Sequence, residues 1–84
     1  MPKQKNDEPP QFYTRLPVLR TERGMSRREL AEAVGVHYQT IGYLERGEYS
    51  PSLVLALKIA EALGVPLGAA FSLTPFPSMA DQIY

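Results

Sequence analysis

Cysteine is missing from this chain of 84 residues, and His37 is its only histidine. The missing thiols exclude disulfides and thiolate metal sites, and one imidazole does not build a zinc site by itself. No apolar run approaches the roughly 20 residues that span a membrane. Paired carboxylates, a nucleophile with a partner base and a phosphate loop are missing too, so we expect neither an enzyme nor a cofactor.

An excess of charge is also missing, because the formal net charge at pH 7 is zero. A strong nonspecific nucleic-acid binder is usually basic. The arginines nevertheless cluster between Arg15 and Arg28, where Glu22 is the single acidic residue. Acidic residues elsewhere cancel the total charge without cancelling this local field. Either a nucleic-acid footprint or an ordinary solvated helix face explains the cluster.

The length of the chain indicates one domain. So short a chain buries only roughly 60% of the surface of its unfolded state, so a partner subunit would add stability. We expect a flexible arm at residues 1–11, a folded domain at 12–77 and a loose tail at 78–84. The polar, proline-bearing start is unlike a secretory signal, so a cytoplasmic, nucleoid-associated protein is expected.

Glycines and capping residues divide the centre of the chain into short helices. The first is expected from near Leu16 to Gly24. The second begins clearly, because the segment Ser26–Glu29 fits a capping box, in which the serine caps the third amide and the glutamate reaches back. Gly35 ends this helix and permits a turn that a side chain would strain.

Three more helices are expected after Gly35. The first runs from His37 or Tyr38 to Arg46, and a long one runs from about Ser52 to Leu63. A short one follows near residues 65–71, and residues 71–76 are expected to be extended. Apolar residues cover most of the long helix, which predicts a central place in the core. They are Leu53, Ala56, Leu57, Ile59, Ala60 and Leu63.

The helices at about residues 27–46 have the spacing of a helix-turn-helix. In this geometry the outward face of the second helix fits the major groove of DNA. Gln39 can bond an adenine edge twice, and the methyl group of Thr40 can touch thymine. A solvated surface residue is the alternative for Gln39.

The patterns RELAEAVGV, QTI..LERG and PSL.LALKIAEALGV, within the stretch from Leu19 to Phe71, resemble the Cro/Xre family of helix-turn-helix regulators. The chain is most similar to short, single-domain members of the cytolysin-repressor type. This resemblance implies an all-α, five-helix, lambda-repressor-like fold with a small two-stranded sheet from the chain ends. It also implies a homodimer that binds palindromic operators in double-stranded DNA.

Site residues follow from the same resemblance. Arg27 matches a phosphate-contacting position, and Arg20 and Glu45 match a structural salt bridge. Phe12–Tyr13 and 73–76 match the two strands. The residues expected at DNA are Arg27, Arg28, His37, Tyr38, Gln39, Thr40, Tyr43, Tyr49, Ser50 and Ser52.

Several of these residues have alternatives. Arg28 could be plain surface, and Tyr38 and Tyr43 could pack on the core or on a partner. His37 replaces the usual serine or threonine cap, so it is expected to be a cap, though a weaker one, or a phosphate contact rather than a metal ligand. Gly42 and Tyr43 also depart from the family pattern, so the operator does not transfer from relatives.

Apolar residues near the end of the chain predict a two-fold dimer contact. They are Ala69, Ala70, Phe71, Leu73 and Phe76. Val54, often polar in the family, indicates either a partner surface or tolerated exposure. The expected function is a transcriptional regulator, acting as a repressor. An antitoxin that binds a toxin protein, or a restriction–modification controller, is the alternative.

Overall fold

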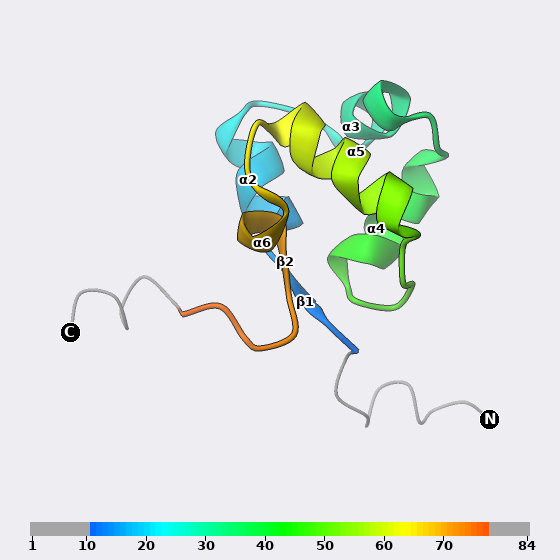
Figure 1. Cartoon of the computed structure of the whole chain (residues 1–84). Helices are drawn as coiled ribbons and strands as arrows, with labels where there is room; N and C mark the ends of the chain where they lie inside the picture. The colour runs from blue at the N-terminus through cyan, green and yellow to red at the C-terminus, as the bar shows by residue number, and fades with distance from the viewer. Residues whose placement is uncertain (1–10, 78–84) are drawn as a thin grey trace.

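The computed structural model describes residues 11–77. Within this range the chain forms five helices and one two-stranded antiparallel sheet (Figure 1). The elements are β1 (Tyr13–Thr14), α2 (Leu16–Glu22), α3 (Arg27–Val34), α4 (Tyr38–Glu45), α5 (Leu53–Leu63), α6 (Leu67–Ala70) and β2 (Phe71–Ser72). This architecture confirms the five-helix, lambda-repressor-like expectation. Apart from Gln11, the expected arm and tail lie outside the described residues.

The ends of the helices follow the local sequence closely. The Ser26 hydroxyl accepts a hydrogen bond from the Glu29 amide at 3.0 Å, and the Ser26 amide donates to Glu29 Oε1 at 2.8 Å, which confirms the capping box. At the start of α5, the Ser52 hydroxyl accepts from the Leu55 amide at 3.0 Å. Gly64 ends α5 with φ 72°, a left-handed conformation that suits glycine.

The sheet joins the two ends of the folded domain. Tyr13 pairs with Ser72 and Thr14 with Phe71, and the Arg15 amide donates to the Ala70 carbonyl at 3.0 Å. The predicted second strand at residues 73–76 was therefore wrong, because β2 begins directly after α6. Beyond Ser72 the chain turns away: the Thr74 amide bonds back to the Ser72 hydroxyl at 3.0 Å.

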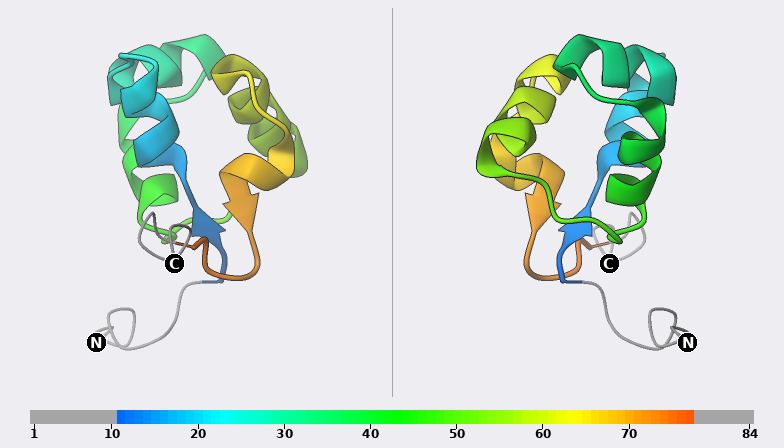
Figure 2. Two further views of the ribbon diagram at one scale, coloured as in Figure 1. Left: turned by 90° about the vertical axis from the view of Figure 1, so that its left-hand side faces the viewer. Right: turned by 90° about the vertical axis from the view of Figure 1, so that its right-hand side faces the viewer.

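One core joins all five helices. Figure 2 shows α2 and α4 on one side, α5 and α6 on the other, and α3 across one end. The largest completely buried side chains are Leu16, Leu30, Ile41, Leu44, Ile59 and Leu63. Because they come from α2, α3, α4 and α5, the core fixes the orientation of the helix-turn-helix.

Helix α5 buries a stripe rather than most of its circumference. Ala56, Ile59, Ala60 and Leu63 are buried, at the spacing of one helix face. The expected inward positions of Leu53 and Leu57 were wrong, since these side chains are 66% and 48% exposed. Helices α3 and α6 pack against α5, and its outer face is left exposed. Among the described helices, none combines the length and apolar character needed to cross a bilayer.

Candidate nucleic-acid interface

Helices α3 and α4 meet at a tight turn. Gly35 has φ 80°, and its amide donates to the Ala31 carbonyl at 2.8 Å. The Val36 amide bonds to the same carbonyl at 3.0 Å. Ala31 is only 2% exposed, and its small side chain lets the second helix approach closely. A left-handed glycine and a small crossing residue thus set the angle between the two helices.

His37 caps α4. Its Nδ1 accepts a hydrogen bond from the Gln39 amide at 3.1 Å, with extended backbone at His37 itself. Only a neutral imidazole has the lone pair for this bond. The ring takes the place of the usual serine or threonine at the start of α4, which confirms the interpretation of His37 as a cap.

A shared carboxylate holds the outer edges of the motif together. Arg20 Nε lies 2.7 Å from Glu45 Oε2, the pair that the family resemblance implies. Arg27 Nε lies 2.9 Å from the other oxygen, Glu45 Oε1. The side chain of Glu45 is 2% exposed, whereas that of Arg27 is 49% exposed. Within residues 11–77, only the Nε of Arg27 has a hydrogen-bond partner, and the buried carboxylate fixes the position of this half-exposed side chain.

The sequence did not reveal the bond between Arg27 and Glu45. These residues are 18 positions apart and lie on different helices, so no local spacing signals the contact. The hint in the sequence is the positive charge of Arg27 itself, which suits a carboxylate such as that of the expected Arg20–Glu45 pair.

Tyr38 lies in a stack that connects the starts of α3 and α4. The Arg28 guanidinium sits 4.1 Å from the centre of the Tyr38 ring. The His37 ring stacks with the same tyrosine at a centroid distance of 4.8 Å. Tyr38 also packs against the core. Arg28 and Tyr38 thus support each other through a cation–π contact, beside any contact they make with DNA.

The outward face of α4 carries polar and aromatic side chains. Gln39 is exposed, Thr40 is half-buried and Tyr43 is 46% exposed. A shallow hollow of about 200 Å³ opens on this face. Its lining residues are Arg27, Tyr38, Gln39, Gly42, Tyr43 and Arg46. Sequence reasoning missed Arg46 as a site residue, although it lies two helical turns after Gln39 and so shares its face.

The loop before α5 contributes less to this surface. Tyr49 is 48% exposed, and Ser50 and Ser52 are exposed as well. The Ser52 hydroxyl already caps α5. Ser50 lies on the rim of a separate apolar hollow beside α6 and the sheet.

The residues predicted at a dimer contact range from completely buried to largely exposed. Ala70 is completely buried, so it cannot contact a second copy, and that part of the prediction was wrong. Ala69 is half-buried. Phe71 and Phe76 are also half-buried. The ring centres of Phe71 and Phe12 are 6.0 Å apart, and the Arg15 guanidinium lies 5.8 Å from the centre of the Phe76 ring. Leu73 is 83% exposed.

Comparison with known families agrees with this geometry. The family model described as Helix-turn-helix matches residues 19–69, which run from α2 to α6. The chain belongs to this helix-turn-helix family, of the Cro/Xre type. Its curated members include transcriptional regulators, and it is not a family of enzymes. Within residues 11–77, no three metal-ligating side chains are grouped.

Three relatives illustrate the similarity. An uncharacterized HTH-type transcriptional regulator of Methanothermobacter thermautotrophicus is 62% identical over 45 residues, 54% of this chain and 65% of that protein. The regulator YgzD of Bacillus subtilis is 46% identical over 53 residues, 63% of this chain and 80% of that protein. The restriction–modification controller protein C.AhdI from Aeromonas hydrophila superimposes with a TM-score of 0.62 and 40% identity, over 66% of this chain and 83% of that chain.

The matches cover only part of each protein. The match to the archaeal regulator spans less than two thirds of that protein's length. The family model likewise stops at residue 69, before β2. Membership therefore rests on the residues from α2 to α6.

Proposed function

We propose that this chain is a transcriptional regulator that binds double-stranded DNA by sequence, and that it represses by occluding a promoter. One observation supports this proposal most directly. The outward face of α4 presents exposed Gln39 beside Arg27, whose position a buried carboxylate fixes. Regulators with a helix-turn-helix insert such a face into the major groove.

The roles of the two residues differ. The Nε–H of Arg27 donates to Glu45, and the terminal nitrogens would donate to a phosphate. The backbone N–H of Gln39 donates to the His37 cap, whereas the carboxamide of its side chain remains available for the edge of an adenine. Phosphate contact by Arg27 would position α4, and Gln39 would read the sequence.

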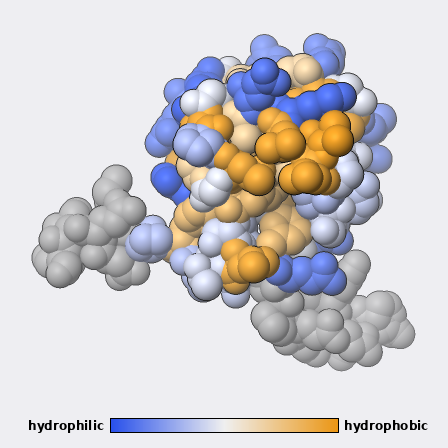
Figure 3. All heavy atoms as spheres, in the orientation of Figure 1, coloured by the Kyte–Doolittle hydropathy of each residue, from blue (hydrophilic) through white to orange (hydrophobic). Residues whose placement is uncertain are grey.

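A palindromic operator needs two copies about 34 Å apart, one turn of DNA. The outer face of α5 offers the surface for a homodimer. Leu53, Val54 and Leu57 are 66%, 61% and 48% exposed, and Leu73 on the adjoining segment is 83% exposed. Hydrophobic side chains gather on this side of the molecule (Figure 3). Contiguous exposed apolar surface of this kind typically marks an interface.

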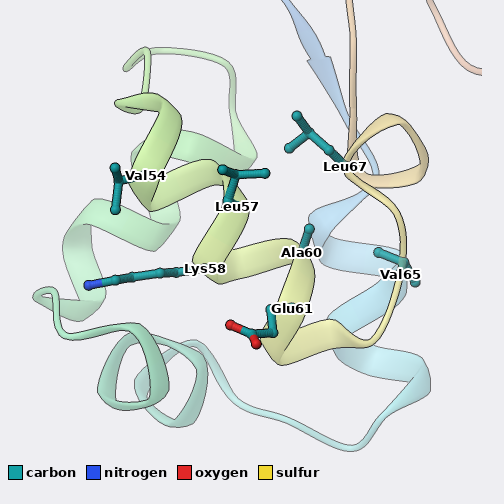
Figure 4. A pocket seen from close by; sticks show the side chains of 7 residues that line it. All are labelled: Val54, Leu57, Lys58, Ala60, Glu61, Val65 and Leu67. Atoms are coloured by element: carbon teal, nitrogen blue, oxygen red, sulfur yellow. The ribbon is translucent and has the colours of Figure 1, made fainter.

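The charges beside this surface suit a second copy of the same chain. Leu57 and Leu67 point toward one another between α5 and α6, with Lys58 and Glu61 at the rim (Figure 4). Neither Lys58 nor Glu61 forms an ion pair with another residue of the described range. A two-fold contact brings the same patch together twice, so each lysine can face the partner's glutamate.

Sedimentation tests the dimer. Leu57→Asp should turn a dimer into a monomer, because it places charge within the apolar face. Val18→Asp is the matched control, since Val18 is 47% exposed on α2, away from this face. A wild-type monomer at operator-binding concentrations, or an unchanged dimer in Leu57→Asp, would exclude this interface.

Footprinting and selection from random DNA test the function itself. We expect one preferred site, and the idea fails if no sequence binds better than random DNA. Arg27→Ala should weaken binding to all sequences alike and lower the slope of log K against log salt by about one. A sequence-dependent loss would instead make Arg27 a reading residue.

A restriction–modification controller is the second candidate. The similarity to the controller from Aeromonas hydrophila, at 40% identity over 83% of that chain, favours it. A methyltransferase gene beside the gene for this chain would support the controller role. Binding of the selected site within the promoter of such a gene would separate it from an unrelated repressor.

A further inference from the structure

Gly42 leaves a bare stretch of backbone on α4, and the side chain of Arg46 covers it. A Cβ placed on Gly42 would lie 3.4 Å from Arg46 Nη1 and 3.9 Å from Nη2. Gly42 is buried. It nevertheless lines the same outward hollow as Gln39, so both residues belong to the same face of α4. The guanidinium therefore folds back by one turn along the helix, rather than extending past its end.

Two neighbours hold the guanidinium on this face. It lies 5.3 Å from the centre of the Tyr43 ring. Arg46 Nε also lies 3.2 Å from Glu48 Oε1, between side chains that are 50% and 37% exposed. Exposed ion pairs of this kind are weak, so a stronger acceptor can replace Glu48 while the tyrosine keeps the side chain in place.

The same hollow contains Gln39 and Arg46 together. Seven residues separate them along α4, about 10 Å of helix rise. The fold of Arg46 over Gly42 shortens that separation by about a turn. A base-reading carboxamide and a planar fork of N–H donors thus face the same short stretch of groove.

We propose that Arg46 is a specificity-determining residue that donates two hydrogen bonds to O6 and N7 of a guanine near the base pair read by Gln39. In the major groove, guanine presents two adjacent acceptors that match the guanidinium fork. Phosphate oxygens also accept hydrogen bonds from a guanidinium, but a phosphate contact carries no preference for a base. This inference rests on the proposed binding of DNA.

Selection of bound sites from a random DNA library tests the reading of guanine. The wild-type protein should select a guanine near the position that depends on Gln39. Arg46→Lys keeps the charge but loses the fork, so preference for this guanine should fall by roughly tenfold while other positions stay unchanged. An equal loss on every sequence, with a lower salt slope, would assign Arg46 to phosphate and overturn the proposal.

Substitutions at Gly42 test the geometry without touching Arg46. Gly42→Leu fills the space and should abolish the guanine preference, since leucine displaces the guanidinium and offers no hydrogen bond. Gly42→Ala is the matched control, because its Cβ would make an ordinary contact at 3.4 Å. Alanine favours helix, so its melting temperature should not fall and its guanine preference should remain.

Two negative outcomes are distinguishable. If no sequence is selected at all, the proposed function itself fails. If a site is selected but Arg46→Lys and Gly42→Leu leave every base preference unchanged, only the role of Arg46 fails. Circular dichroism of each variant shows whether the fold persists, and Arg46→Lys, an exposed and charge-conserving change, keeps the test valid if Gly42→Leu does not fold.

Discussion

The inward and outward faces of α4 differ in burial and in polarity. The inward face places Ile41 and Leu44 in the core with no exposed surface, and α4 ends on Glu45, whose carboxylate is buried with arginines from two other elements. The outward face has exposed Gln39 and Tyr43 and the uncommon residue Gly42. One helix therefore combines an ordinary packing surface with an unusual reading surface.

This difference shows how one scaffold can carry many specificities. Packing constrains the inward side chains, since a well-packed core tolerates few changes of volume. The exposed side chains of the outward face, such as Gln39, meet no such constraint. Changes on the inward face should therefore alter stability, and changes on the outward face should alter recognition.

Leu44→Ala should give the largest effect. Leu44 is completely buried, and loss of a core leucine costs roughly 3 kcal/mol. Urea unfolding measures this loss directly. A fall in the free energy of unfolding of less than about 1 kcal/mol would mean that Leu44 does not pack in the core.

Glu45→Gln should come next. The carboxylate is 2% exposed and bonded by both Arg20 and Arg27, and loss of one partner from a buried pair costs roughly 3 kcal/mol. Arg27→Gln is the matched control, since its side chain is 49% exposed and exposed pairs contribute less than about 1 kcal/mol. Equal losses in the two variants would contradict the unequal burial of this network.

Gln39→Ala should reverse the pattern. We expect a loss of about 1–3 kcal/mol in operator binding and relaxed specificity at one base position. The midpoint of urea unfolding should stay unchanged, because the side chain is exposed. Equal losses on specific and random DNA would remove its reading role.

His37→Ala should give the smallest effect, at the boundary between the two faces. Loss of the Nδ1 acceptor for the Gln39 amide should destabilise the protein by about 1 kcal/mol. His37→Ser should restore the cap and the stability. If serine does not restore them, the ring contributes through its stack on Tyr38 instead.

Much of the scaffold was predictable because its signals are local. Ser26 with Glu29 marks the start of α3, and Gly35 marks its end. Ser52, near which the long helix was expected to begin, caps α5. Each of these signals acts within one or two turns, where a hydrogen bond or a backbone conformation depends on neighbouring residues alone.

The errors share a different origin. Leu53 and Leu57 were expected inside, because the apolar pattern of α5 does not say which flank other elements cover. The second strand was placed too late, because its start depends on where α6 brings the chain beside β1. Ala70 was expected at a dimer contact, although it is completely buried in the core of a single copy of the chain.

Local sequence was sufficient to specify the helices, their caps and the turn at Gly35, since hydrogen bonds within a few residues determine these features. Only the fold decided that Glu45 joins Arg20 to Arg27, that Arg46 covers Gly42 with its guanidinium beside Gln39, and that the outer face of α5 stays exposed. Such relations join different elements or depend on rotamers. Packing of the whole domain selects them from many local possibilities.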